Sequence, residues 1–325
     1  MGAPFVWRAL FVWEYVMTFL ALATCGDLPD WEVDDAPFHS ALEASGVRFK
    51  RPVWDDPGVD WGQFDAVLIR TTWDYQLKQP AYKRWIESTA AKTRVLNPPD
   101  VVVWNTEKTY LRDLEEVGAP LTPTVWLKKG GDVDLLTLMN SRGWTEGFLK
   151  PVIGATARET LPFDLTPSKL VLANAHLKRL LPGESMMLQP FCRSVLEEGE
   201  YSAVFFEGKF SHGVQKIPVP GDYRVQDDFG ATDRPHRFSS EDYERVLVIE
   251  GALSSLLKER FDRKSLLYSR IDLLRGEDGM LSLNELELVE PSLFFRHDAT
   301  AAMRLVRGVL RLLSEESDPS DLKGA

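Results

Sequence analysis

The sequence predicts an α/β protein with two parts: an N-terminal domain on a parallel sheet, then an α+β region on antiparallel sheets. Two observations predict this division. From Met17 to about residue 104, short apolar runs such as TFLALATC and DAVLIR alternate with helical stretches. Further along, the apolar runs are separated mostly by turns. Alternation of strands and helices favours a parallel sheet with helices on both faces, whereas strands joined by turns favour antiparallel pairing.

Length and composition agree with a globular protein and exclude several classes. The 325 residues are 44% hydrophobic, which is enough for about two domains with their own cores. A net charge of −11 without a local basic patch argues against a nucleic acid partner. Two distant cysteines, Cys25 and Cys192, form neither a disulfide framework nor a zinc site. We therefore expect a cytoplasmic protein.

The apolar segment from Phe5 to Cys25 needs separate treatment. Arg8 and Glu14 interrupt it, and a charge in the middle of a membrane span is costly, so we expect no membrane segment. Leu22-Ala23-Thr24 before Cys25 weakly matches a lipoprotein cleavage site, which leaves a non-catalytic, lipid-anchored binding protein as an alternative. We predict instead that Thr18 to Thr24 is the first buried strand and that residues 1–16 are an irregular extension.

The predicted N-terminal domain, residues 17–104, carries polar loops after its strands. In open parallel sheets, ligands bind at the carboxyl ends of the strands. Arg70 directly follows the apolar run AVLI, so we place it among the catalytic and substrate residues. Neighbouring acids either face the same crevice or only cap turns and helices. These acids are Asp34, Asp35, Asp55, Asp56 and Asp74.

The predicted second domain spans residues 105–313, in two halves, 105–188 and 189–313. It begins with a helix from Asn105 to Val117, which Gly118 ends. Residues 314–325 lack apolar anchors and should form a disordered tail. Walker, GxSxG and HExxH motifs are all absent from the sequence, which argues against the enzyme classes that they mark.

A phosphate-binding loop is predicted after Lys150. This lysine follows an apolar strand and precedes a loop of small residues that contains Gly154, Thr156 and Arg158. Backbone N–H groups of such a loop can surround a phosphate, and the lysine supplies a positive charge. Lys108 lies near the start of the expected helix, where it is a second phosphate ligand or a solvated helix lysine.

A predicted hairpin places acidic residues on one face. The turn Gly276 to Gly279 separates two apolar strands, and a four-residue loop would put Arg275 opposite Met280. Asp272, Glu285 and Glu287 then share a face, and carboxylates that converge without partners favour a divalent cation. A three-residue loop would move Asp272 to the other face. Glu290 competes with Glu287 as the last ligand.

Several strings in the chain resemble the ATP-grasp superfamily, in particular the ATP-grasp ligases of D-cycloserine biosynthesis and their uncharacterised relatives. The resemblance extends from about Met17 onward and includes a pre-ATP-grasp N-terminal domain. It rests on WDDPGVDW, IRTTWDY, VVWNTEK, SHGVQK, GDYRVQ and ELELVEPSL.

The resemblance implies a role for each candidate residue. Lys108, Lys150 and the loop residues would contact nucleotide phosphates, Gln189 and Phe191 would form the hinge that reads adenine, and Glu200 would bind the ribose. Catalytic roles fall to Lys216, Arg224 and Arg270. Asp272, Glu285 and Glu287 would hold metal, although Asn is usual in the family where Glu287 stands. His212 is expected to be structural.

The implied reaction joins a carboxylate to an amine. ATP would phosphorylate a small, amino-acid-like carboxylate, with one or two Mg²⁺ ions and Mn²⁺ as a substitute, and an amine would attack the acyl phosphate. A phosphotransferase on the same fold is the nearest alternative. The expected partners are a small-molecule carboxylate and an amine, and a homo-oligomer is compatible with the sequence. The acid and the amine themselves are not specified.

Overall fold

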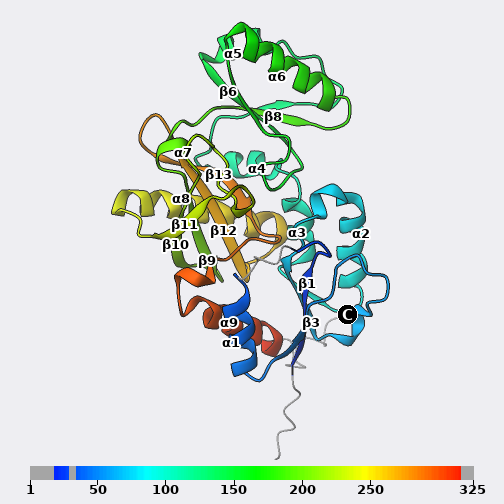
Figure 1. Ribbon diagram of the computed structural model, residues 1–325. Helices are drawn as coiled ribbons and strands as arrows, with labels where there is room; N and C mark the ends of the chain where they lie inside the picture. The colour runs from blue at the N-terminus through cyan, green and yellow to red at the C-terminus, as the bar shows by residue number, and fades with distance from the viewer. Residues whose placement is uncertain (1–17, 29–33, 316–325) are drawn as a thin grey trace, which may run out of the picture.

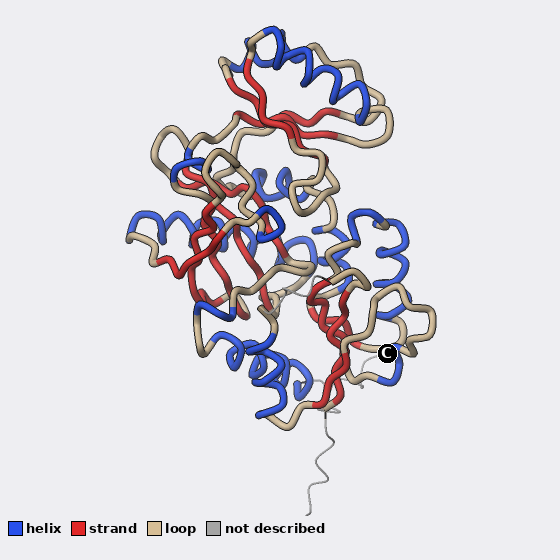
Figure 2. The backbone as a smooth tube through the Cα atoms, in the orientation of Figure 1, coloured by secondary structure: helices blue, strands red, loops and turns tan. Residues whose placement is uncertain are grey.

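The computed structural model describes residues 18–28 and 34–315 (Figure 1). The expected extension, residues 1–16, lies outside the described residues, as does most of the expected tail. The last helix, α9 (Ala301–Glu315), includes Ser314 and Glu315, so the helix continues two residues further than the sequence suggested. Three separate groups of strands form the framework of the described chain (Figure 2).

The N-terminal sheet is parallel, as predicted, with the order β2-β1-β3-β4. Its strands and the helices around it are β1 (Phe19–Thr24), α1 (Ala36–Ala44), β2 (Arg48–Lys50), β3 (Ala66–Thr71), α2 (Gln79–Ala90), β4 (Arg94–Leu96) and α3 (Pro99–Asn105). Short 3-10 helices, η1 (Trp61–Gln63) and η2 (Tyr75–Leu77), lie in its loops. The expected first strand is therefore present and begins one residue later, at Phe19.

Helices cover both faces of this sheet. Successive side chains of β1 point to opposite sides, so each face has its own core. Leu20 and Leu22 pack in one core with Phe38 of α1 and with α9. Ala21 and Ala23 pack in another with the aromatic residues of α2. The C-terminal helix thus returns to the N-terminal domain, where it lies beside α1 (Figure 1).

Cys25 is buried at the end of β1, where its amide donates to the carbonyl of Thr71. A lipid on Cys25 would require removal of the strand before it, and β1 lies inside the sheet, between β2 and β3. This placement opposes the lipid-anchored alternative. Among the helices of the described residues, none has the length and apolar character needed to cross a membrane.

The second sheet, with α5 and α6, forms the upper lobe in Figure 1. Its four strands are antiparallel in the order β5-β8-β6-β7. The elements are β5 (Val125–Leu127), α5 (Leu135–Arg142), β6 (Glu146–Pro151), β7 (Leu161–Asp164), α6 (Pro167–Leu180) and β8 (Met186–Pro190). Met139 of α5 and Leu177 of α6 pack on the sheet through Leu149 and Phe163.

The third sheet is also antiparallel, with the order β11-β10-β9-β12-β13. Its strands are β9 (Glu200–Phe206), β10 (Lys209–Ile217), β11 (Thr232–His236), β12 (Tyr268–Arg275) and β13 (Leu281–Glu287). Helices α4 (Tyr110–Glu116) and α8 (Ser240–Phe261) cover one face, where Ile271 and Leu273 join their core. Arg270 and Asp272 therefore point to the opposite face. The short elements α7 (Ser194–Glu197), η3 (Asp227–Phe229) and η4 (Phe295–His297) complete the described chain.

The predicted helix from Asn105 to Val117 is interrupted. Asn105 ends α3, and α4 begins only at Tyr110. The Asn105 side chain donates to the carbonyl of Leu286 and accepts from the amide of Leu288. Asn105 is thereby bonded to the end of β13. In the turn that separates the two helices, the Lys108 amide donates to the Val152 carbonyl.

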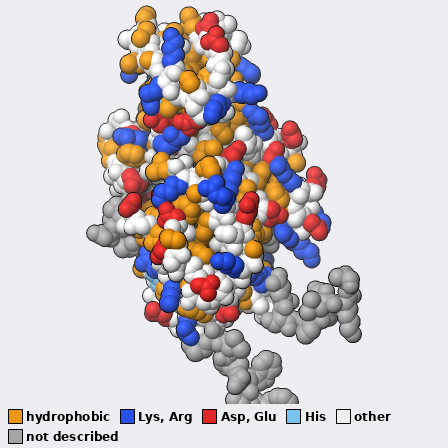
Figure 3. All heavy atoms as spheres, turned by 90° about the vertical axis from the view of Figure 1, so that its right-hand side faces the viewer, with side chains coloured by type: hydrophobic (Ala, Val, Ile, Leu, Met, Phe, Trp, Pro, Cys, Tyr) orange, Lys and Arg blue, Asp and Glu red, His pale blue; other side chains and the backbone are white. Residues whose placement is uncertain are grey.

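Positive and negative side chains are interspersed on the face of the molecule shown in Figure 3.

Candidate active site

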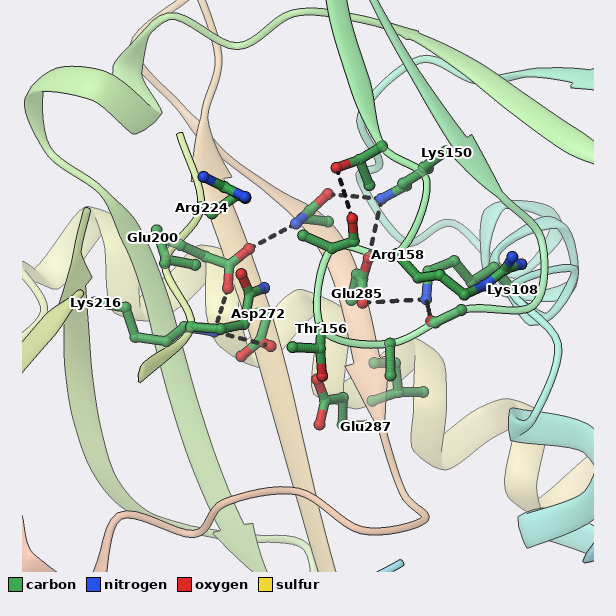
Figure 4. Close-up of a pocket in the computed structure, with 18 of the residues that line it drawn as sticks. Lys108, Lys150, Thr156, Arg158, Glu200, Lys216, Arg224, Asp272, Glu285 and Glu287 are labelled. Atoms are coloured by element: carbon green, nitrogen blue, oxygen red, sulfur yellow. Dashed lines mark hydrogen bonds and ion pairs between the residues drawn. The ribbon is translucent and has the colours of Figure 1, made fainter. Parts of the chain in front are cut away.

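A large cavity lies where the loops of all three sheets meet. Its lining includes residues of the upper lobe, the third sheet and the loop after β3. The charged residues at its centre, shown in Figure 4, are Lys108, Lys150, Glu200, Lys216, Asp272 and Glu285.

The acidic hairpin has a different register from the predicted one. Arg275 lies opposite Leu281 and not Met280, because residues 276–280 form a five-residue loop closed by a 2.8 Å bond from the Gly276 amide to the Met280 carbonyl. Leu273 lies opposite Leu283, but Asp272 lies opposite Glu285, so Asn284 is the extra residue of a β-bulge. The bulge restores the shared face of the two acids, and Arg270 lies opposite Glu287.

Glu285 bridges two lysines from distant parts of the chain (Figure 4). Its Oε1 lies 3.1 Å from Lys150 Nζ, and its Oε2 lies 3.3 Å from Lys108 Nζ. Burial disfavours the carboxylate, but the two lysines outweigh burial and lower the pKa of Glu285 to about 2. Burial also lowers the pKa of Lys150, whose exposed fraction is 3%. The acid and its two lysines form one charged unit.

Asp272 is surrounded by donors. Arg270 donates to both of its carboxylate oxygens at 2.9 and 2.8 Å, Ser202 donates at 2.6 Å, and Lys216 Nζ lies 3.2 Å away. Although burial opposes ionisation, these cations hold the pKa of Asp272 well below its usual range. Lys216 also pairs with Glu200. Burial is the largest effect on Glu200 itself, and its pKa is raised.

Among the three predicted metal ligands, Glu287 is the one whose ionised form is least stabilised. Its Oε1 lies 2.6 Å from Arg270, but burial, reinforced by the charge of Asp272, raises the pKa of Glu287 to about 7. The expectation of three unpaired, converging carboxylates is therefore wrong, because Arg270 of the same strand and three lysines distant in sequence neutralise them. Within residues 18–28 and 34–315, no three Asp, Glu, His or Cys side chains are grouped closely enough to hold a metal ion by themselves.

Asn284, which we did not predict, completes this network. Its Oδ1 accepts from Lys150 at 3.1 Å, and its Nδ2 donates to Glu200 at 2.6 Å. In a regular strand, Asn284 and Glu285 would point to opposite faces; the bulge lets both reach the cavity.

The predicted phosphate loop follows β6 and lines the cavity. Lys108 Nζ donates to the Gly154 carbonyl at 2.7 Å, so this lysine holds the start of the loop. Thr156 has a φ of 49°, an unfavourable conformation for a residue with a side chain. Arg158 lines the cavity but pairs with Glu184 and donates to the Ile153 carbonyl.

The predicted hinge forms an aromatic end of the cavity. The Phe148 ring contacts those of Phe191 and Tyr223, with ring centroids 6.1 and 5.4 Å away. Gln189 is buried and donates to Thr124 at 2.8 Å. The Phe191 amide already donates to the Glu146 carbonyl and is therefore not free to bind a ligand.

Arg224 lies at the rim of the cavity, beyond Glu200 (Figure 4). It donates to both carboxylate oxygens of Asp222, and its guanidinium carbon lies 3.9 Å from the centroid of the Phe229 ring. This partly exposed side chain is the most accessible of the predicted catalytic residues.

Arg70 lies outside the cavity lining, contrary to the expectation that it faces a substrate crevice. It forms a buried pair with Asp35, with bonds of 3.0 and 2.7 Å, and donates to the Pro291 carbonyl. The predicted acidic neighbours also bond to other residues of the protein. Asp34 accepts from Ser292 and pairs with Arg296. Asp74 accepts from Trp54, Asp55 and Asp74 both pair with Lys78, and Asp56 accepts from the Gly58 amide. The loop after β3 instead contributes Trp73 and Tyr75 to the lining.

His212 is structural, as expected. It is buried, and its ring nitrogens bond to the Leu293 carbonyl and the Ser211 hydroxyl.

Comparisons with known proteins agree with this geometry. Residues 20–97 match the family described as D-cycloserine synthetase DcsG, N-terminal domain. The cycloserine biosynthesis protein DcsG of Streptomyces lavendulae is 30% identical over 305 residues, covering 91% of this chain and 99% of that protein. The crystal structure of D-cycloserine synthetase DcsG superposes with a TM-score of 0.81 at 28% identity, over 91% of this chain and 99% of that one.

A more distant structure shares the fold. D-alanine–D-alanine ligase from Bacillus anthracis, complexed with ATP, has a TM-score of 0.66 at 14% identity and covers 92% of this chain and 99% of its own. The protein has the fold of the ATP-grasp ligases, enzymes that form C–N bonds at the expense of ATP and use magnesium. Within that class, the chain belongs to the DcsG family.

Proposed function

We propose that this ligase phosphorylates the carboxylate of a small, amino-acid-like substrate and joins the resulting acyl group to an amine. The observation that carries the proposal is the set of four cations, Lys108, Lys150, Lys216 and Arg270, around one row of acids in a single cavity. Phosphoryl transfer needs such positive charge around the transferring oxygens, because little else lowers its barrier.

The ion pairs of Glu285 suggest how the site accepts nucleotide. Lys108 and Lys150 now neutralise this acid, and a triphosphate would offer them a second anion. As the two lysines turn toward the phosphates, Glu285 would lose their positive charge, and magnesium would supply positive charge in their place. Asp272, Glu285 and Glu287 supply carboxylate oxygens, the hard donors that Mg²⁺ and Mn²⁺ prefer, so the residues fit one or two such ions.

The proposed reaction has two steps and needs no reactant besides ATP, the carboxylate and the amine. A carboxylate oxygen attacks the γ-phosphorus, and ADP leaves. The amine nitrogen then attacks the acyl carbon, inorganic phosphate leaves, and the nitrogen loses a proton. Arg270 lines the cavity beside Asp272 and Glu287, and we assign it the stabilisation of the transferred phosphate and of the oxyanion. Lys216 and Arg224 would contact phosphate or substrate, and Glu200 the ribose.

Product analysis tests this function. Purified enzyme with ATP and magnesium is screened against amino acids and amines, while ADP, inorganic phosphate and amide are measured together. We expect equal amounts of all three, and hydroxylamine should trap the acyl phosphate as a hydroxamate. ADP formed with a stable phosphorylated product, without free phosphate or amide, would instead show a phosphotransferase.

A further inference from the structure

The segment that follows β13, residues 289–294, forms a wall of the cavity. Four side chains of this wall segment line the cavity, those of Val289, Glu290, Ser292 and Phe294. The segment also contacts Arg270, whose Nη1 donates to the Ser292 carbonyl at 2.9 Å. The guanidinium carbon of Arg270 lies 5.4 Å from the centroid of the Phe294 ring. The wall segment is therefore a support of the arginine to which we assign the stabilisation of phosphate and oxyanion.

Asp34 of the N-terminal domain holds this wall segment. Its Oδ2 accepts from the Ser292 hydroxyl and from the Phe294 amide, both at 2.8 Å. Its Oδ1 accepts from Arg296 Nη1, also at 2.8 Å. Asp34 is buried and lies just before α1, so a single carboxylate of the first domain bonds to three residues about 260 positions further along the chain.

The backbone of Phe294 shows why the wall segment needs this support. Its φ of 50° and ψ of 43° are left-handed, a conformation that is unfavourable for a bulky side chain. Such a conformation persists only where the surrounding structure holds it. Asp34 bonds to the amide of this residue, and the ring packs in the same core as Phe295. Loss of the Asp34 carboxylate would let the backbone relax and move the Ser292 carbonyl away from Arg270.

We propose that Asp34 is a positioning residue, which holds Arg270 in place through the wall segment. The inference rests on the proposed ligase function, in which Arg270 stabilises the transferred phosphate. Asp272 and Glu287 also hold Arg270, but carboxylates that bind magnesium as well attract the arginine less strongly. The Ser292 carbonyl is not among the proposed metal ligands and keeps its bond in that state. The contribution of Asp34 is therefore largest when the site is loaded.

Binding of a phosphoryl mimic tests the proposal without turnover. Tetrafluoroaluminate imitates the phosphoryl group during transfer, and calorimetry compares the affinity for ADP and magnesium with and without it. We expect the unmodified protein to bind ADP more tightly with the mimic, because Arg270 then has an anion to stabilise. Asp34→Ala should reduce this gain about 10-fold or more and leave the affinity for ADP and magnesium alone unchanged. Ser292→Ala keeps the bond between Asp34 and the Phe294 amide and should lose less of the gain.

Asp242→Ala is the matched control. Asp242 also pairs with an arginine, Arg275, but lies outside the lining of the central cavity. Its replacement should lower the stability of the fold and keep the full gain from tetrafluoroaluminate. Arg270→Met should lose the gain, which separates an effect on the arginine from a general weakening of the fold.

Several results would overturn the proposal. They are a full gain in Asp34→Ala or in Arg270→Met, an equal loss of affinity with and without the mimic in Asp34→Ala, and the absence of any gain in the unmodified protein. If Asp34→Ala does not fold, Ser292→Ala decides: a reduced gain supports the proposal, and a full gain overturns it. Failure of the ligase function is a separate result, in which the variants bind the mimic as expected but the unmodified protein forms no amide.

Discussion

Asp272 lies directly opposite Glu285 in the third sheet, and a β-bulge at Asn284 makes this pairing possible. One residue later along β12, Leu273 faces Leu283 in the core. The bulge therefore changes the register between the core part of the hairpin and its acidic part. It sets two acids side by side, each neutralised by its own cations: Asp272 by Arg270 and Lys216, and Glu285 by Lys108 and Lys150.

Glu285→Gln should abolish ADP formation and also destabilise the protein by about 2 kcal/mol at neutral pH, because it leaves the buried Lys150 without its carboxylate partner. Three carboxylates without partners would give the opposite effect on stability, because the substitution would relieve their mutual repulsion. Denaturant unfolding and an ADP-release assay measure the two effects. Glu197→Gln, at an exposed site on α7, is the control. Undiminished turnover in saturating magnesium would exclude Glu285 as an essential ligand.

Glu287→Gln should raise stability in a pH-dependent way. The pKa of Glu287 is raised from its ordinary 4.5 to about 7 in the folded protein, so the folded state binds more protons than the unfolded one between these values. Below pH 4.5 Glu287 is protonated in both the folded and the unfolded state, so its ionisation costs no stability. The cost in folding free energy grows between pH 4.5 and pH 7 and reaches its full value above pH 7. Melting curves should therefore show the variant more stable at pH 8, by about 1 kcal/mol, and equal to the parent at pH 4. A gain that is the same at both pH values would refute this assignment.

Lys150→Ala should abolish measurable nucleotide binding, because Lys150 follows β6 immediately before the phosphate loop and is buried beside Glu285. Calorimetry with ATP and magnesium measures the affinity, and circular dichroism checks the fold. Lys169→Ala removes an exposed lysine of α6 in the same lobe and should bind ATP normally. Parent-like affinity in Lys150→Ala would disprove the site.

The sequence predicted most of the local structure that positions the site. The apolar residues 66–69, in a chain where such runs alternate with helical stretches, indicated the buried strand β3, and a lysine before a small-residue loop is a local signal. The return of α9 to α1 was not predictable, because it joins residues separated by most of the chain. Local patterns specify which residues form an element and carry little information on its distant partners.

The same limit explains the errors in the site. Alternation along the hairpin placed Asp272 and Glu285 on one face, but the loop length and the bulge depend on packing against α8 and β9, so the register was wrong and Asn284 was missed. Apart from Arg270 in the hairpin itself, the cations that neutralise the acids come from a turn, β6 and β10, and no spacing in the hairpin indicates them. Arg70 was assigned to the substrate because it follows an apolar run, and nothing local to it indicates a pair with Asp35, 35 residues away.

Arg70→Met should destabilise the fold and leave ligand affinity unchanged. Arg70 and Asp35 have side-chain exposures of 2% and 5%, and removal of the arginine leaves a buried carboxylate without its partner. We expect a loss of about 3 kcal/mol or more in the free energy of unfolding, measured with denaturant. Lys78→Met breaks the exposed pairs with Asp55 and Asp74 and should cost less than about 1 kcal/mol. If Arg70→Met keeps its stability but raises the KM for the carboxylate substrate, Arg70 binds substrate after all, and the buried pair must open during the reaction.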